Sequence, residues 1–134
     1  MSVQLHSPAR MVPNTPYHHV AIAKGQRQVF IAGQVAHMPN GEPVPALLGD
    51  QTAQALRNIH TGLTAAGATF HDVVRLTVYV VNWSADLMPE LMRGIEEAAQ
   101  ELGLPLPMPP ASLIGVQALF EPDILVEIEA TAVC

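Results

Sequence analysis

The chain has 134 residues, a length that suits one compact domain, and we expect residues 1–134 to form a single domain. Its formal net charge of −6 and its lack of a Lys/Arg-rich run argue against a nucleic-acid partner, which needs a basic surface. Only 13% of the residues are charged whereas 49% are hydrophobic. This apolar excess favours burial of part of the surface against further copies of the chain.

The cysteine content and the hydropathy of the chain indicate the cellular compartment of the protein. The single cysteine, Cys134, excludes an internal disulfide and fits a reducing environment. The first ten residues, MSVQLHSPAR, contain no apolar segment of signal-peptide length, and no window approaches a membrane span. We therefore expect a cytoplasmic protein without a membrane partner.

The first half of the chain predicts two strands, a loop and a helix. Residues 17–33 have the pattern of a hairpin, in which one strand around Val20 turns at 24–27 into a second at 29–31. Residues 38–49 carry three prolines and two glycines, which indicates a loop. Asp50 is expected to cap a helix that runs to about Gly67. Its apolar residues recur at steps of three and four and form one buried stripe: Ala53, Leu56, Ile59, Leu63 and Ala66.

The second half predicts a strand, a helix and two final strands. The β-branched segment 73–81 indicates a central strand with bulky apolar side chains on both faces. Residues 85–102 predict a helix with Pro89 in its first turn, where the missing N–H costs little. After an extended segment at 104–110, two strands are joined by a turn at 121–123. This order predicts an α+β fold in which one sheet is backed by both helices.

Two carboxylates interrupt the last strand. Strand periodicity places Glu127 and Glu129 on one face, about 6.5–7 Å apart, and the intervening apolar residues on the core face. A solvated outer face would explain two glutamates without further chemistry. Because residues 73–81 predict a sheet that is apolar on both sides, we instead expect the carboxylates to lie at or near a subunit interface.

Motifs for metals and cofactors are missing from the sequence. It contains no GxGxxG, P-loop, GxSxG, HExxH or CxxC pattern. Of six histidines only His18 and His19 are adjacent, and adjacent strand residues point to opposite faces. We therefore expect neither a metal site nor a cofactor.

Several short segments together resemble the Rid family (reactive intermediate deaminases, also called YjgF-like). They are Pro16-Tyr17, VFIAGQ at 29–34, QTAQALRNI at 51–59, AAG at 65–67, DVVRLTVYV at 72–80 and VEIEA at 126–130. The resemblance implies a chorismate-mutase-like α+β fold. It also implies a homotrimer whose three sheets form an inner barrel, with small-molecule ligands bound in clefts between subunits.

The resemblance also implies site residues. In the best-known branch of the family an arginine clamps the carboxylate of an amino-acid-derived imine, and a glutamate on the last strand positions the water that hydrolyses it. Glu127 matches this glutamate, Tyr17 a tyrosine that closes the pocket from a neighbouring subunit, and Gly33 a glycine that lines the cleft. Ser112 occupies the place of the arginine, and Ile114 that of a nearby cysteine.

The serine departs from the pattern of that branch. A hydroxyl cannot replace the planar, bidentate guanidinium that binds a carboxylate. Three interpretations stay open: a hydrolase of imines or enamines that lack the usual carboxylate, with Glu127 as catalytic base; a non-catalytic trimer that binds a small metabolite; and a structural protein whose cleft is filled by its own side chains. The acidic composition argues against ribonuclease activity. We expect Arg75 to be structural, and Glu127 to have a more elevated pKa than Glu129.

Overall fold

The structure, a computed structural model, describes residues 2–134. In chain order its elements are β1 (Ser2–His6), β2 (Val20–Lys24), β3 (Gln28–Gln34), α1 (Leu48–Ala65), the 3-10 turn Phe70–Asp72, β4 (Val73–Val81), the 3-10 turn Ala85–Leu87, α2 (Met88–Leu102), β5 (Ala111–Val116) and β6 (Val126–Val133). Within the described residues no helix has the length and apolar character needed to cross a membrane.

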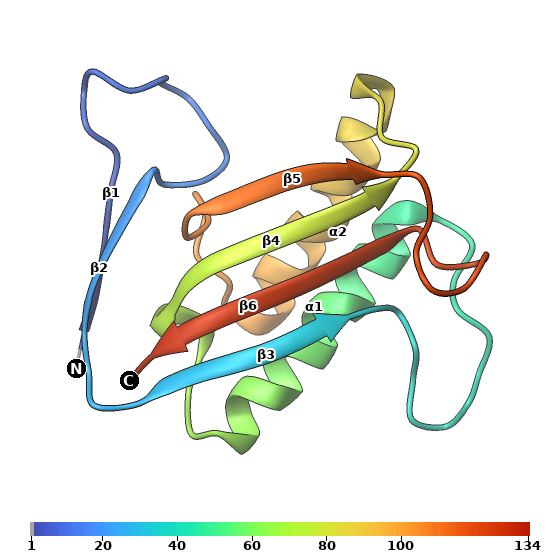
Figure 1. Cartoon of the computed structure of the whole chain (residues 1–134), viewed down its shortest axis with the longest axis horizontal. Helices are drawn as coiled ribbons and strands as arrows, with labels where there is room; N and C mark the ends of the chain where they lie inside the picture. The colour runs from blue at the N-terminus through green and yellow to red at the C-terminus, as the bar shows by residue number, and fades with distance from the viewer. Residues whose placement is uncertain (1) are drawn as a thin grey trace.

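The molecule has two layers, a four-stranded mixed sheet and a pair of helices that cover one of its faces (Figure 1). The strand order is β3-β6-β4-β5; β6 is antiparallel to both of its neighbours, and β4 is parallel to β5. Strands β1 and β2 form a separate antiparallel pair beside this sheet. The α+β prediction of one sheet backed by two helices is therefore confirmed.

The core lies between the helices and the sheet. Leu56, Ile59 and Leu63 of α1 are fully buried, as the spacing of three and four predicts. The two helices approach closely where Gly49 faces Gly94, since a Cβ on Gly94 would collide with the carbonyl oxygen of Gly49. Pro89 lies in the first turn of α2, and Gly103 ends that helix with a φ of 77°.

Strand β6 follows the predicted alternation. Val126, Ile128, Ala130 and Ala132 are buried toward the helices, whereas Glu127, Glu129 and Thr131 are half-buried on the opposite face. The helix-free face, called the open face below, therefore carries both carboxylates. It also exposes the large side chains of Phe30 and Ile114.

The predicted hairpin at 17–33 is wrong. Strand β2 pairs with β1, which the sequence did not suggest, and β3 pairs with β6. The connection does not close a hairpin because Arg27 exchanges both backbone hydrogen bonds with Cys134, at 2.9 and 3.0 Å. A local pattern predicts a strand but does not identify its partner.

Asp50 does not cap α1. The helix begins at Leu48, two residues earlier, with Leu47 at the cap position and no side-chain cap. The first N–H groups of a helix have no acceptor within it. Here Glu90 of α2 accepts a 2.8 Å hydrogen bond from one of them, the N–H of Gly49. Asp50 accepts a hydrogen bond of 3.0 Å from Arg93.

Two further expectations about the sheet need correction. A register shift between Val73 and Arg75 places Val73 in the core, so the open face of β4 carries Arg75, Thr77, Tyr79 and Val81 and is less apolar than expected. The final two strands are not neighbours either, because β4 lies between them. Ser112 shares the open face with the glutamates, whereas Leu113 packs against the core.

Candidate functional site

Two rows of side chains cross the open face at right angles to the strands. Glu129 pairs with Thr77, which pairs with Ser112. In the next row Glu127 pairs with Tyr79, which pairs with Ile114. Because paired residues of adjacent strands point to the same side, the register brings the predicted residues Ser112, Ile114 and Glu127 to one face.

Gly33 lies directly against Glu127. A Cβ added at position 33 would come within 2.9 Å of three atoms of the Glu127 side chain, closer than real Cβ atoms approach their neighbours. The register of β3 against β6 shifts between Ile31 and Gln34, and this irregularity carries Gly33 to the carboxylate. Within residues 2–134 Glu127 has neither an ion pair nor a side-chain hydrogen bond. It is half-buried and free to bind a ligand or water.

Glu129 is engaged in a hydrogen bond. The hydroxyl of Tyr79 donates to Oε1 of Glu129 at 2.9 Å. This hydrogen bond, with smaller contributions from burial and from the charge of the carboxylate, raises the pKa of Tyr79 above its ordinary value. Tyr79 was not among the site residues predicted from the sequence, although its place two residues after Thr77 puts it on the same face.

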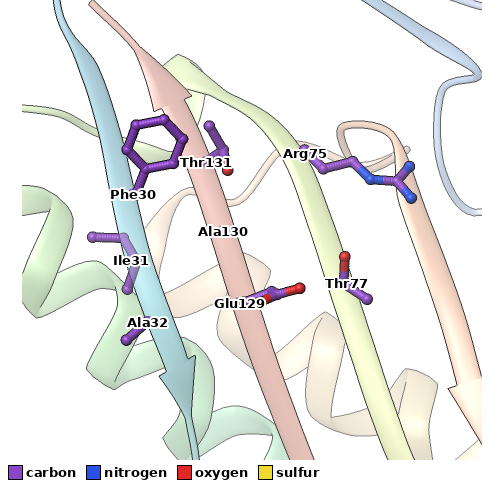
Figure 2. Close-up of a pocket in the computed structure, with 8 residues that line it drawn as sticks. All are labelled: Phe30, Ile31, Ala32, Arg75, Thr77, Glu129, Ala130 and Thr131. Carbon is purple, nitrogen blue, oxygen red and sulfur yellow. The ribbon is translucent and has the colours of Figure 1, made fainter.

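The guanidinium of Arg75 lies at Ser112. Its Nη2 donates a 2.5 Å hydrogen bond to the Ser112 hydroxyl, across the gap between β4 and β5. Figure 2 shows the Arg75 side chain extending toward β5 and away from Glu129. Arg75, Phe30 and Thr131 are among the residues that line a pocket of about 360 Å³ on this face. Arg75 was expected to be structural, and its contact with Ser112, the position that the resemblance matches to an arginine, was not foreseen.

Tyr17 lies beside the segment that leads into β5. It is half-buried in the loop before β2 and forms an isolated bridge with Met108. Together with Ser112 it lines a cavity of about 320 Å³ whose wall is mostly apolar, including Met88 and Leu91 of α2. Within one chain, therefore, Tyr17 and Ser112 share a cavity, whereas Gly33 and Glu127 meet elsewhere.

Ligands for a metal ion do not converge in the described part of the chain. No group of three or more His, Cys, Asp or Glu side chains is arranged there to hold a metal ion. The available chemistry consists of an unpaired carboxylate, a tyrosine–glutamate pair and an arginine–serine pair on one sheet face.

Comparison with known proteins identifies the family. Residues 7–134 match the family described as Endoribonuclease L-PSP. The structure of YyfB from Yersinia pestis, a Rid-family protein whose function is unknown, is 40% identical over 100% of both chains, with a TM-score of 0.86. The chain belongs to the Rid (YjgF-like) family.

Curated members of the Rid family are similar in sequence as well. A RutC family protein of Pyrococcus horikoshii is 35% identical over 121 residues, which cover 90% of this chain and 88% of the relative. The 2-iminobutanoate/2-iminopropanoate deaminase of Mus musculus is 39% identical over 57 residues, or 42% of each chain. The Rid relatives thus include a protein named for imine deamination, matched over less than half of its length.

Proposed function

We propose that this protein hydrolyses an imine or enamine type of reactive intermediate and releases ammonia. The observation that carries the proposal is the unpaired carboxylate of Glu127, half-buried against Gly33 on the open face. A carboxylate in this setting can accept a proton from water and direct the water at a bound carbon. The deaminase name of the mouse relative supports the same reaction class.

In the proposed reaction water adds to the C=N bond of the imine. As the water oxygen attacks the carbon, Glu127 accepts one of the water protons and passes it to the nitrogen, which forms a neutral carbinolamine. Glu127 then accepts the proton of the carbinolamine hydroxyl and delivers it to the departing nitrogen as the C–N bond breaks, so that a carbonyl compound and ammonia leave. An enamine substrate first takes up a proton on carbon to become the imine. No oxidant, metal or cofactor takes part.

The proposed active unit is a homotrimer with ligand clefts between subunits. Phe30 and Ile114 are exposed on the open face, at 72% and 43% of their surface, and a second copy would cover such side chains. Tyr17 and Glu127 are not brought together within one chain, so a neighbour has to supply the tyrosine if both act at one cleft. The cytoplasmic location and the lack of a nucleic-acid partner stay predictions.

A non-catalytic, metabolite-binding trimer is the second candidate. Ser112 favours it, because position 112 itself carries no charge to hold a carboxylate substrate. Such a protein would bind a small molecule in the same cleft without turnover.

Ammonia release separates the two candidates. The protein would be added to freshly generated imines with and without carboxylate groups, and ammonia would be measured against spontaneous hydrolysis. We expect acceleration by the wild type, its loss in Glu127→Gln, and its retention in part in Glu129→Gln, which serves as the matched control on the same strand. Saturable ligand binding without acceleration for any imine would favour the non-catalytic candidate.

A further inference from the structure

Gln51 of α1 is a buried amide that binds two loops at once. It is 1% exposed, and its Nε2 donates 2.8 Å hydrogen bonds to the carbonyl oxygens of Pro45 and Asp123. Its Oε1 accepts a 2.9 Å hydrogen bond from the N–H of Leu125. Both N–H donors of the amide and its carbonyl oxygen are thus used, although the packing of α1 alone would need only an apolar side chain at this position.

Asn58 makes similar contacts two helical turns further along α1. It follows Gln51 by seven residues (58 − 51), so the two side chains lie on the same side of the helix, about 10 Å apart along its axis. The Nδ2 of Asn58 donates 2.8 Å hydrogen bonds to the carbonyl oxygens of Val35 and His37. Gln54 holds this amide in place by donating a 3.0 Å hydrogen bond to its Oδ1.

The two amides bind the segments that bring Gly33 and Glu127 together. Val35 lies two residues after Gly33, and Leu125 lies two residues before Glu127. The loops that follow β3 and precede β6 lie at the same end of the sheet (Figure 1). The pairing of β3 with β6 ends one residue before it would reach Glu127. Because the β-ladder stops there, the hydrogen bonds from α1 fix how closely the two segments approach at the carboxylate.

An ion pair between the same two loops is too exposed to have this effect. The Nε2 of His37 lies 3.3 Å from Oε2 of Glu121, with both side chains about half exposed. Exposed pairs of this kind contribute little, and this one is charged only while the histidine is protonated. Hydrogen bonds from a buried amide are directional, and breaking them leaves backbone groups without partners. Removing the amide should therefore displace the backbone that it binds.

From this arrangement we infer that Gln51 and Asn58 are positioning residues for Glu127, which fix the two backbone segments that hold its carboxylate against Gly33. Helix α1 covers the opposite face of the sheet from Glu127, so both amides act through the backbone and not on a ligand (Figure 1). A displacement of about 1 Å can slow a reaction about 100-fold. The effect on turnover rests on the proposed function, whereas the positioning itself needs no turnover.

The amide signal of Gly33 in proton–nitrogen NMR spectra reports the contact directly. Because the Glu127 carboxylate lies against Gly33, we expect this signal to shift over the pH range in which carboxylates take up a proton. Glu127→Gln should abolish the shift and thereby assign it. Gln51→Met and Asn58→Leu keep the approximate volume of each side chain but not its hydrogen bonds, and each should lose most of the shift.

Thr52→Val is the matched control. Thr52 is a fully buried polar residue next to Gln51 on α1, but its hydroxyl donates to the carbonyl oxygen of Leu48 at 2.8 Å, within the same helix. Thr52→Val should therefore keep the full shift of the Gly33 signal. All spectra are recorded well below the melting temperature of every variant, so that lower stability alone does not change the signal.

Ammonia release tests the consequence for the reaction. Gln51→Met and Asn58→Leu should each lower kcat at least about tenfold and change KM less, whereas Thr52→Val should change neither. A Gly33 shift of full size in either amide variant would overturn the inference, as would failure of both variants to fold. If the wild type releases no ammonia from any imine, the proposed function fails and the NMR result alone decides the positioning role.

Discussion

The hydroxyl of Tyr79 donates a 2.9 Å hydrogen bond to Glu129, whereas Glu127, two residues earlier on the same strand face, has no such partner in the described chain. The two carboxylates that interrupt β6 are therefore not equivalent. One is bound to a neighbouring side chain and the other remains available. In the proposed reaction, this difference leaves Glu127 as the carboxylate that is available to water or a ligand.

The Tyr79–Glu129 pair predicts an unusual tyrosine titration. Ionising Tyr79 removes the proton that bridges the two groups and leaves two negative charges together, so its pKa lies above the ordinary value. Glu129→Gln should lower the pKa of Tyr79 toward that of a free tyrosine. Absorbance at alkaline pH follows the ionisation, and Tyr79→Phe separates the signal from that of Tyr17. A tyrosine titration that Glu129→Gln does not move would contradict the hydrogen bond.

Glu127→Gln is expected to leave the thermal stability nearly unchanged or slightly higher. The carboxylate is half-buried and has no ion pair among the described residues, so the neutral amide loses little and avoids the cost of burying a charge. Thermal unfolding at neutral pH measures this effect. A large loss of stability would show that the carboxylate binds a partner group in the assembled protein.

Gly33→Ala should disturb Glu127 specifically. The new methyl group would overlap the outer part of the Glu127 side chain, which is flexible and half-buried and can turn aside, so the loss of unfolding free energy is expected at or below the low end of the roughly 1–3 kcal/mol typical of overpacked cores. Glu127→Ala removes the overlapping atoms, so the double variant should recover most of that loss. Chemical denaturation of both single variants and the double variant completes the cycle. Additive losses would mean that the two positions do not touch.

Acid stability should depend on Glu90. Arg93 holds the pKa of this carboxyl at about 2, with a smaller contribution from the N–H of Gly49, compared with an ordinary value of 4.5. Below pH 4.5 the unfolded chain therefore takes up a proton that the folded protein refuses, and stability falls as the pH drops toward 2. Glu90→Gln should flatten this part of the profile of melting temperature against pH. Added salt should also reduce the effect, since the Arg93 side chain is exposed and the Glu90 side chain is only half-buried.

The matched control for that profile is Glu96→Gln. Glu96 is an exposed glutamate of the same helix with no ion pair in the described residues. Glu96→Gln changes the net charge by the same amount as Glu90→Gln. Its melting temperature should fall with decreasing pH as steeply as that of the wild type. The same slope in Glu90→Gln would show that the ion pair with Arg93 does not persist in solution.

Periodicity and resemblance predicted different parts of this structure. The alternation of β6 was enough to place Glu127 and Glu129 on one face, because a strand repeats every two residues. The contact of Gly33 with Glu127 could not come from periodicity, since a shift in register creates it. The resemblance matched Gly33 to a glycine that lines the cleft but did not indicate this contact. The Arg75–Ser112 contact could not be predicted, because it requires the parallel pairing of β4 with β5. Neither the strand periodicity nor the resemblance indicated that pairing.

The strands β3 and β4 do not pair with each other, because β6, which follows both in the chain, lies between them. During synthesis on the ribosome the earlier strands emerge first and have no partner on that side until residues 126–133 appear. Their backbone groups and apolar faces stay open to chaperones, or to strands of other nascent chains, for that interval. A translation pause before residues 126–133 have emerged, either at their own codons or within those of α2, is therefore expected to yield insoluble product.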